Sequence, residues 1–297
     1  MTVALTIVIP TKNRADELAK LLASIGRLDD LVPLCPEIII SDNDSRDDTS
    51  SRVAALSKCF PVPVRRIVTR KPGKSAAINE ALRVAKGDTL ACLDDDVVVD
   101  TQWLNAVARF CRNGNYKVGQ GRILLQPPDA EDPQIQQLLH RYRTIPYLNF
   151  NPEILEVHSL NGANFIIGRA LLQKFGGFDE RLGPGASGTS EDVELSRRIG
   201  QAGYKIGYMR EATVYHSVDQ SRLTEEYFAR VHRRQGHSRL LIKPRGTAHI
   251  LFNLSRASVQ YMLYSLTRQE RKRYRNKGRV HHYRGMLEAK WMARPST

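Results

Sequence analysis

Short apolar runs and helical patterns alternate along the first 115 residues of the chain. The runs are rich in β-branched residues, which favours strands that are buried on both faces. They predict strands at Leu5–Pro10, Ile38–Ser41, Val64–Thr69 and Asp88–Leu93. Strands of this kind, separated by helices, are typical of a parallel sheet covered on both sides. We therefore expect an α/β fold with a Rossmann-like, mostly parallel sheet and helices on both faces.

Apolar residues three and four positions apart predict a helix after three of these strands. The first helix stops at Gly26 and buries a face formed by Leu18, Leu21, Leu22 and Ile25. In the second, Ser75 is expected to cap the N-terminus and Gly87 to close the C-terminus. The third covers residues 101–113 and ends at Gly114.

Residues 115–219 show a less regular pattern. The segment "HSLNGANFIIGRALLQKFGGFDE" predicts a strand, a short helix and a Gly-Gly turn. The segment "SEDVELSRRIG" predicts a helix with acidic residues in its first turn, and "KIGYMREATVYH" predicts one or two late strands. Beyond residue 220 the pattern is helical, first at Leu223–Gln235 and then at Thr247–Leu266, followed by a basic stretch.

The charge is divided unevenly along the chain. The net charge is +14, from 45 Lys+Arg and 31 Asp+Glu, and residues 220–297 hold 18 of the bases and 4 of the acids. Residues 1–219 are therefore neutral, with 27 of each. This shift predicts a domain boundary at 219/220. We expect a catalytic domain at 1–219, divided near residue 115, and a basic helical C-terminal extension at 220–297.

The sequence lacks the features that would indicate a membrane span, a secretory signal or a cysteine pair. No apolar run reaches 18 residues, and the short N-terminal run lacks the flanks of a secretory signal. The four cysteines form no C-x-x-C pair, as is typical of thiols in a reducing cytosol. We expect a cytoplasmic protein, with residues 220–297 attracted to an anionic membrane surface on its inner face. No nucleic-acid motif accompanies the basic residues, so we expect no nucleic-acid partner, although basic nucleic-acid binding is the alternative function from another class.

Acidic residues follow two of the predicted strands. Asp42 ends the second strand, and Asp94, Asp95 and Asp96 follow the fourth. Ligands of parallel α/β sheets bind outside the carboxyl ends of the strands, so these acids gather where a ligand is expected. Grouped carboxylates are oxygen ligands suited to Mg²⁺ or Mn²⁺, and such an ion holds a diphosphate. The sequence therefore predicts a divalent-metal site at this edge.

Other nucleotide-binding classes fit the sequence less well. Gly73-Lys74-Ser75 ends like a P-loop, but the earlier glycine that a P-loop requires would fall at Val68. A dinucleotide-binding fold needs glycines after the first strand, where the chain reads "PTKNRA". A nucleotidyltransferase on a similar fold stays open as an alternative, although Lys12 and Arg14 are a poor substitute for its glycine-rich basic loop.

Five segments in a fixed order carry a family resemblance: "TIVIPTKNR", "IIISDNDSRDDT", "KPGKSAAINEALRVAKGDTLACLDDDV", "NGANFIIGRALLQKFGGFDE" and "SEDVELSRRIGQAGYKIGY". Together they resemble a family 2 inverting glycosyltransferase of the GT-A fold, over about residues 3–218. The family's usual "DDGS" is here Asp42-Asn43-Asp44-Ser45, so Asp42 is carried over and Asn43 departs from the pattern.

The resemblance implies a donor site and a metal site. The donor, a UDP-sugar in the commonest case, with GDP- and dTDP-sugars as alternatives, would be bound by Pro10, Thr11, Arg14, Asp42, Lys74, Asn79, Asp94 and Asp95. Asp42 would accept a hydrogen bond from the base. Asp96 would be the main metal ligand, with Asp94 in support and His216 completing the shell.

The resemblance also implies the catalytic and acceptor residues. Asp192 matches the position of the base that an inverting transfer needs beside the acceptor hydroxyl. The acceptor side would be lined by Glu191, Asn164, Phe178 and Asp179. The acceptor itself would be a growing glycan or a lipid-linked sugar.

Overall fold

The computed structural model describes residues 4–127 and 131–292, and these form two compact units. The first unit runs as far as Gln126 and includes Pro146–Glu180 and Glu191–Ser217. The second unit contains the two segments between these and the described chain from Val218 onwards. The family resemblance was expected to begin near residue 3 and the C-terminal extension to end at residue 297. Residues 1–3 and 293–297 lie outside the described residues.

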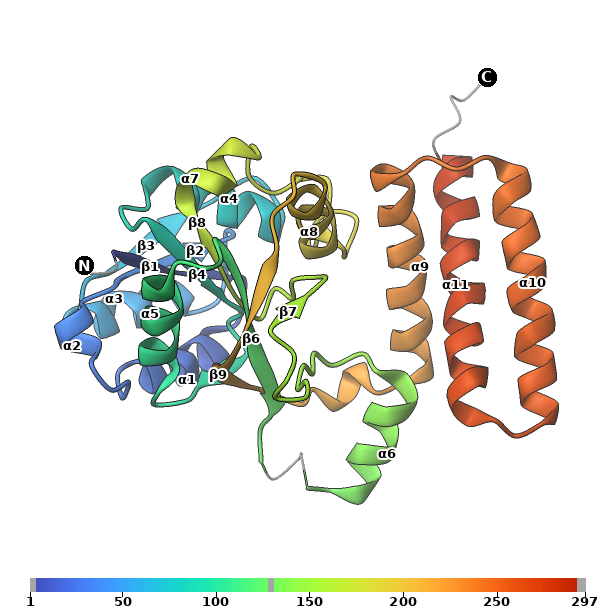
Figure 1. Ribbon diagram of the computed structural model, residues 1–297, viewed down its shortest axis with the longest axis horizontal. Coiled ribbons are helices and arrows are strands. Elements are labelled where there is room, and N and C mark those ends of the chain that lie inside the picture. Colours follow the sequence, from blue (N-terminus) through green and yellow to red (C-terminus); the bar gives the residue numbers. More distant parts are fainter. Residues whose placement is uncertain (1–3, 128–130, 293–297) are drawn as a thin grey trace. The chain divides into compact units, whose positions relative to one another are not determined.

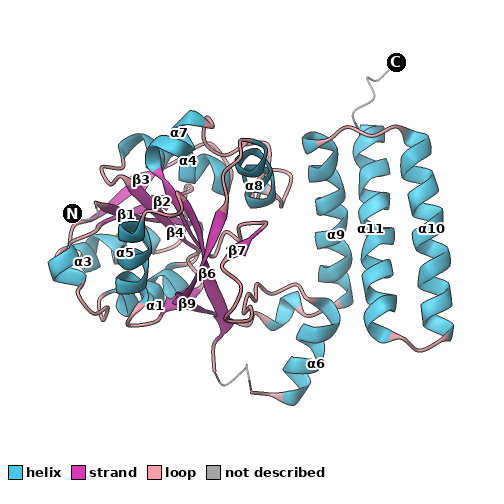
Figure 2. Cartoon of the chain, viewed as in Figure 1, coloured by secondary structure: helices cyan, strands magenta, loops and turns pink. Residues whose placement is uncertain are grey.

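The first unit is built on one nine-stranded sheet (Figures 1 and 2). The order is β3-β2-β1-β4-β8-β6-β9-β5, and β7 also pairs with β9. The strands β1 to β4 are mutually parallel, whereas β8 runs antiparallel to both β4 and β6. The strands are β1 (Leu5–Thr11), β2 (Glu37–Asp42), β3 (Val64–Val68), β4 (Thr89–Leu93), β5 (Val97–Val99), β6 (Val118–Leu125), β7 (Glu156–Val157), β8 (Asn164–Gly168) and β9 (Ile206–His216).

Helices cover both faces of this sheet, as the continuous apolar strands predicted. In the first unit they are α1 (Ala15–Ile25), α2 (Leu31–Leu34), α3 (Thr49–Ser57), α4 (Lys74–Val84), α5 (Trp103–Asn113), α7 (Arg169–Lys174) and α8 (Glu191–Gln201). Within residues 1–115, α2, α3 and β5 were not predicted, and the other elements lie within a few residues of their predicted bounds. Beyond residue 115, the strands β6 and β7 and the helix at residues 133–142 were not predicted.

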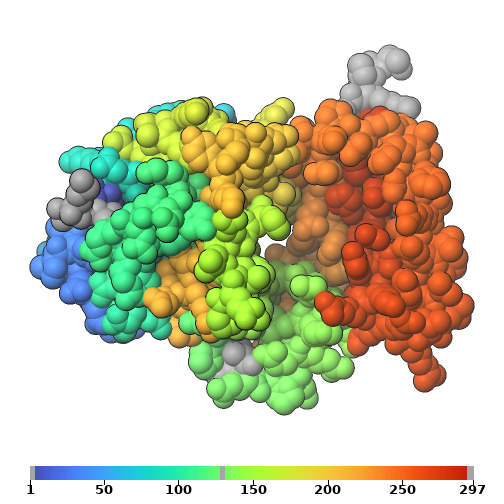
Figure 3. All heavy atoms as spheres, viewed as in Figure 1, coloured from blue at the N-terminus to red at the C-terminus, as the bar shows by residue number. Residues whose placement is uncertain are grey.

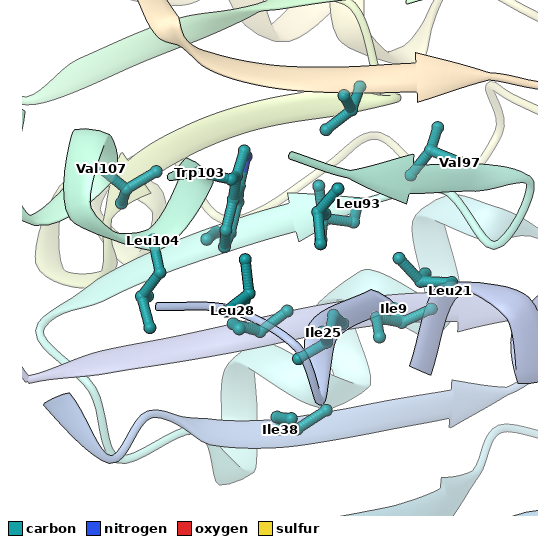
Figure 4. Close-up of a cluster of buried hydrophobic side chains, with 14 of the residues drawn as sticks. Ile9, Leu21, Ile25, Leu28, Ile38, Leu93, Val97, Trp103, Leu104 and Val107 are labelled. Carbon is teal, nitrogen blue, oxygen red and sulfur yellow. The ribbon is translucent and has the colours of Figure 1, made fainter. Parts of the chain in front are cut away.

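Two hydrophobic clusters fill the spaces above and below the sheet. Alternate residues of a strand go to opposite clusters: Ile38 and Ile40 join one, and Ile39 joins the other. Figure 4 shows the first cluster, where Trp103 of α5 and Ile25 of α1 point toward the same interior as Leu93 of β4. This core fixes the strand ends that carry the acids.

The predicted ends of α4 were wrong. Ser75 lies within the first turn, and the helix is preceded by Gly73, whose φ of 122° is one that favours glycine. The helix ends at Val84, before Gly87, whose N–H donates to Thr6 Oγ1 at 2.9 Å. A β-carbon on Gly87 would lie 2.5 Å from the backbone nitrogen of Thr6, so this glycine allows close packing instead of closing the helix.

The second unit contains a bundle of three long helices. They are α9 (Glu225–Ile242), α10 (Thr247–Leu266) and α11 (Glu270–Met292). The same unit also contains the helix α6 (Pro133–Tyr142) and a 3₁₀ turn (Gln220–Arg222). Contacts join α11 to both α9 and α10, and Figure 1 shows α11 lying between them. Of the helices that the structure describes, none is long and apolar enough to cross a membrane.

Glycines bring α9 and α11 into close contact. A β-carbon on Gly285 would lie 2.1 Å from the backbone oxygen of Arg233, and one on Gly236 would lie 2.1 Å from the backbone oxygen of His282. Both obstacles are backbone atoms, which cannot move aside without shifting a helix. The separation of the two helices is therefore set by these positions.

The Gly285→Ala variant should consequently destabilise the bundle. Overpacking costs about 1–3 kcal/mol, and chemical denaturation followed by circular dichroism measures it. Gly200→Ala is the matched control, because Gly200 lies in α8 with nothing within 4 Å of its β-carbon position. This control should gain roughly 0.5–1 kcal/mol from helix propensity. Equal unfolding midpoints for the two variants would contradict the close helix contact.

Candidate functional site

The predicted acids come together at the carboxyl ends of the parallel strands. Thr11 at the end of β1 pairs in register with Asp42 at the end of β2. Asp94, Asp95 and Asp96 follow β4 and lead directly into β5. Pro10, the residue before Thr11, is buried in β1 opposite Ser41. These strand ends form the edge where the fold class places a ligand.

Each of the three consecutive aspartates is paired with a cation, and Asp95 and Asp96 share one arginine. Asp94 forms an ion pair with Lys74. Asp95 accepts a hydrogen bond from Thr11 Oγ1 at 2.8 Å and another from Arg14 Nη1 at 3.0 Å. Asp96 accepts from the same Arg14 nitrogen at 2.8 Å. Arg14 and Lys74 therefore offset the repulsion between three negative charges placed side by side.

Burial and these cations set the charge state of the cluster. Burial raises the pKa of Asp95 to about 6, against the opposing effect of the Arg14 charge. Burial alone would lower the pKa of Arg14, but the charges of Asp95 and Asp96 outweigh it and raise that pKa. The site thus holds a permanent cation among carboxylates whose negative charge is costly to bury.

Asp96 and His216, the two main residues of the expected metal site, lie next to each other. His216 ends β9 and is 1% exposed, and its Nδ1 lies 2.7 Å from the carbonyl oxygen of Ser217. A ring that donates from Nδ1 presents the Nε2 lone pair, when neutral, to Asp96 Oδ1 at 3.3 Å. Two acceptors that face each other at this distance are stabilised by a positive charge between them. Of the two expected ions, Mn²⁺ accepts a nitrogen ligand beside a carboxylate more readily than Mg²⁺, which prefers oxygen ligands alone.

The predicted metal set is only partly assembled. Asp96 and His216 meet, whereas Asp94 turns to Lys74 instead. Within residues 4–127 and 131–292, no group of three or more His, Cys, Asp or Glu side chains is arranged to hold a metal ion. Any ion bound here would need further ligands from a substrate or from water.

A second acidic group lies at the start of α8. Lys74 Nζ is 4.0 Å from Glu191 Oε1, so the lysine that binds Asp94 also faces this helix. Asp192 Oδ2 accepts from the N–H of Gly162 at 3.2 Å. A β-carbon on Gly162 would lie 2.6 Å from Lys74 Nζ, so the missing side chain leaves room for the ammonium group. Lys74 thereby links the two acidic groups, and Nζ is held among carboxylates rather than open to a nucleoside.

The pKa values of Glu191, Asp192 and Lys74 are all shifted from their ordinary values. Burial raises the pKa of Glu191, and the neighbouring charge of Asp192 raises it further. Burial also raises the pKa of Asp192, while the charge of Lys74 opposes the change. Lys74 itself has its pKa lowered by burial and, to a greater extent, raised by Asp94 and Glu191. Perturbed carboxyls beside a fixed cation are typical of sites that transfer protons.

Asp42 is fully buried and firmly held. Its Oδ2 accepts from Arg66 Nε at 2.9 Å and Nη2 at 2.6 Å, and its Oδ1 accepts from the N–H of Ser45 at 2.9 Å. Arg66 was not predicted as a site residue, because it follows Arg65 in β3 and nothing in that pair of arginines distinguishes it from a surface residue. Its charge compensates the carboxylate that was expected to bind the base.

Asn43, which departs from the family pattern, has a defined structural role. Its Nδ2 donates to the carbonyl oxygens of Thr69 and Lys71 at 2.9 and 2.7 Å, and its Oδ1 accepts from the N–H of Gly73 at 2.8 Å. An aspartate could not donate to two carbonyl oxygens. The amide therefore holds the loop that leads into α4 and Lys74.

The predicted roles of Asn79, Asn164 and Phe178 need correction. Asn79 does not face the strand ends: its amide exchanges hydrogen bonds with the backbone of Phe178 at 2.8 and 3.0 Å and donates to Glu180. Asn164 is fully buried, and its amide bonds to Trp103, Arg122 and Ala212. Phe178 packs in the second hydrophobic cluster, so these three residues organise the fold, whereas Asp179 beside them is only partly buried.

Asn79→Ala tests this correction. The variant loses the hydrogen bonds to Phe178 and Glu180 and leaves buried backbone groups without a partner, which costs about 1–3 kcal/mol of unfolding free energy. Nucleotide affinity, measured by calorimetry, should stay within a few-fold of wild type. A large loss of nucleotide affinity at unchanged stability would restore Asn79 to the donor site.

Comparisons with known proteins identify a family and a fold. The family model described as glycosyl transferase family 2 matches residues 6–176. A probable glycosyltransferase, YdaM, from Bacillus subtilis is 24% identical over 193 residues, which cover 60% of this chain and 42% of the relative. The succinoglycan biosynthesis protein ExoM of Rhizobium meliloti is 26% identical over 236 residues, which cover 77% of this chain and 72% of that protein. The chain thus spans less than half the length of the first of these relatives.

The fold also matches a solved structure. The mannosyltransferase PcManGT from Pyrobaculum calidifontis, solved in complex with GDP-Man and Mn²⁺, superposes with a TM-score of 0.68 at 16% sequence identity. The alignment covers 99% of this chain and 89% of that one. At this identity the match establishes the GT-A fold that the sequence analysis expected.

Proposed function

Because the chain belongs to glycosyl transferase family 2, we propose that it transfers a sugar, with inversion and with a divalent metal, from a nucleotide sugar to a glycan or lipid-linked acceptor. One observation carries the proposal. Asp94, which follows β4, and Glu191, which begins α8, both lie within 4.0 Å of Nζ of one partly buried lysine, Lys74. This arrangement brings the acids proposed for the donor and the acids proposed for proton transfer to one site.

The donor side of the proposal uses the strand ends of β1, β2 and β4. The backbone near Pro10 and Thr11 borders the nucleotide, Asp42 recognises the base, and Asp95 lies near the ribose and the diphosphate. Asp95 is already oriented by Thr11 and Arg14, so its position does not depend on the donor. We take a UDP-sugar as the first donor to test and keep GDP- and dTDP-sugars as alternatives.

Charge on the leaving diphosphate must be offset when the glycosidic bond breaks. Asp96 and His216 would hold the divalent metal, Mn²⁺ or Mg²⁺, which supplies this compensation when bound. Arg14 adds a fixed positive charge within 3.0 Å of Asp95 and Asp96. A diphosphate oxygen that approaches this edge would draw Arg14 away from the carboxylates, because phosphate competes for the same guanidinium donors.

The acceptor side of the proposal is built on α8. Asp192 takes the proton from the acceptor hydroxyl as that oxygen attacks the anomeric carbon from the face opposite the leaving diphosphate. The N–H of Gly162 and the charge of Lys74 hold the Asp192 carboxylate in position and limit the rise of its pKa. Glu191, which is more deeply buried, is the second candidate for the base, and Asp179 stays a proposed acceptor contact.

The partners proposed for the second unit follow from its charge. Residues 220–297 carry the whole net charge of +14, and we propose that they bring a cytoplasmic enzyme to an anionic membrane surface. A nucleotidyltransferase on this fold is the alternative reaction. It would release pyrophosphate, whereas sugar transfer releases a nucleoside diphosphate, so the two reactions are separated by their products.

A donor screen tests the proposed function. The purified chain is incubated with UDP-, GDP- and dTDP-sugars, with Mn²⁺ or with a chelator, and the released nucleoside diphosphate is measured. We expect slow donor hydrolysis with one nucleotide class, dependent on the metal. Release of pyrophosphate from a nucleoside triphosphate and a sugar phosphate, supplied in place of the nucleotide sugar, would contradict the proposal. No release from any nucleotide sugar, together with no binding of any nucleoside diphosphate, would contradict it as well.

A further inference from the structure

The helix α10 of the second unit exposes an unusual number of large apolar side chains. Six side chains of α10 are exposed: Leu251, Phe252, Val259, Met262, Leu263 and Leu266. Their exposure is high, with Phe252 at 66% and Leu266 at 83%. Single exposed apolar residues are common on protein surfaces, but six on one helix of 20 residues indicate a contact surface.

These six residues form one continuous face. Successive residues of an α-helix are about 100° apart, so all six fall within an arc of roughly 120° that runs along the whole helix. The opposite side of α10 carries the buried residues Ile250 and Ala257 and packs on α11. We call the six residues the apolar stripe of α10. The bundle that contains α10 is coloured orange to red in Figure 3.

Positive charge lies at both ends of the stripe. Lys243 and Arg245 precede α10, and the exposed Arg268, Arg271 and Lys272 follow it. The sequence of α10 contains neither Asp nor Glu. A second copy of the chain would bring one segment of net charge +14 against another, and the two would repel. An anionic lipid surface offers negative headgroups to the Lys and Arg residues and acyl chains to the apolar stripe. The occupant that fits both features is a bilayer that contains anionic lipids.

A tryptophan lies at one end of the same surface. Lys290 Nζ donates to Thr247 Oγ1 at 3.3 Å, so the end of α11 lies beside the start of α10. Trp291, the next residue, is 72% exposed, and Met292 is exposed as well. Tryptophan favours the boundary between lipid headgroups and acyl chains, where its ring and its N–H both find suitable surroundings.

From these features we infer that the apolar stripe of α10 inserts into the headgroup region of an anionic membrane, with the neighbouring Lys and Arg residues on the lipid phosphates. The inference rests on the membrane contact proposed above and identifies the surface that makes it. It places the anchor on α10, not on the basic helix α11. Deleting residues 268–297 would be a poor test, because α11 lies between α9 and α10 and its loss would disrupt the bundle.

Vesicle binding by two matched variants tests the inference. The stripe variant carries Phe252→Ser, Leu263→Ser and Leu266→Ser, and the charge variant carries Arg268→Gln, Arg271→Gln and Lys272→Gln. All six positions are exposed, so both variants should keep the helical circular dichroism of the full chain. Binding is measured by sedimentation with phosphatidylcholine vesicles, with and without phosphatidylglycerol, at low and high salt.

We expect the stripe variant to bind anionic vesicles at least about 100-fold more weakly at both salt concentrations. The charge variant should lose about fivefold per residue at low salt, and little at high salt, where charges are screened. Wild-type affinity in the stripe variant would overturn the inference and leave a purely electrostatic contact. If the wild type ignores vesicles and forms a dimer that the stripe variant abolishes, the stripe is a self-association surface and the inference also fails.

Trp291 reports the contact directly. The chain has two tryptophans, and Trp103 is fully buried in the first unit, so a vesicle-dependent blue shift of the emission comes from Trp291. Trp291→Phe should remove the shift, and its persistence in that variant would count against the inference. Donor hydrolysis is measured in every variant, and unchanged hydrolysis with lost vesicle binding shows that the surface and the reaction are separate.

Discussion

Asp192→Asn should bind donor and metal as the wild type does and transfer sugar about 10²–10⁴-fold more slowly. The amide has nearly the same shape as the carboxylate, and its oxygen can still accept from the N–H of Gly162. Its NH₂ group then replaces the oxygen that accepts from the N–H of Val193, but that hydrogen bond is exposed and water can replace it. The start of α8 should therefore keep its structure. What the variant lacks is a group that takes a proton from the acceptor hydroxyl.

Glu191→Gln is the comparison for this variant, because Glu191 precedes Asp192 and both carboxyls lie near Lys74. Transfer rates and nucleotide affinities are measured for both variants. If Asp192→Asn transfers at nearly the wild-type rate and Glu191→Gln does not, the base is Glu191. If Asp192→Asn loses nucleotide and metal binding together, the start of α8 belongs to the donor side and the proposed division of the site is wrong.

Asp96→Ala should abolish the metal-dependent part of donor binding. The variant removes the carboxylate that faces His216 Nε2 at 3.3 Å and that pairs with Arg14 at 2.8 Å. We expect nucleoside-diphosphate affinity in Mn²⁺ to fall by at least about 100-fold, since even groups that only support a metal ligand contribute 10–100-fold. Affinity in the presence of a chelator should change much less. Isothermal titration calorimetry with and without Mn²⁺ measures both.

Asp88→Asn provides the control for the loss of one acidic residue. Asp88 lies just before β4, at the opposite end of the same strand, and its side chain is 84% exposed. Its replacement should leave nucleotide and metal affinity unchanged. Unchanged affinity in Asp96→Ala, with Mn²⁺ present, would show that Asp96 holds no metal.

A strand or helix was predictable from the sequence where apolar residues run without interruption along one or both of its faces. Ile38, Ile39 and Ile40 are apolar because both sides of the sheet are covered, and that run alone indicates a buried strand. The short strand β5 was missed because its three valines follow three aspartates. The 3-residue length of β5 gives no periodicity to detect, and its pairing with β9 depends on residues more than 100 positions away.

The site was predictable as a set of acids but not as a set of contacts. Motif order located Asp94, Asp95, Asp96 and Asp192, because strand ends and helix starts have local signatures. Which carboxylate meets Lys74 and which meets His216 depends on the direction of each side chain. Asn79 shows the same limit: its place in the motif suggested the donor, whereas packing directs its amide to Phe178.

The charge pattern predicted a membrane contact for residues 220–297 as a whole and did not indicate which helix would make it. The apolar stripe lies on α10, whose residues are apolar on both sides. Which of those two sides is covered by α11 becomes clear only from the packed bundle.

The anomeric configuration of the first product tests the central claim most directly. No acceptor needs to be known, because water can take the place of the acceptor hydroxyl beside Asp192. An α-linked nucleotide sugar that the enzyme hydrolyses is followed by proton NMR before mutarotation mixes the anomers. Attack from the face opposite the diphosphate, assisted by Asp192, predicts the β-anomer as the first sugar released. Release of the α-anomer would contradict the account.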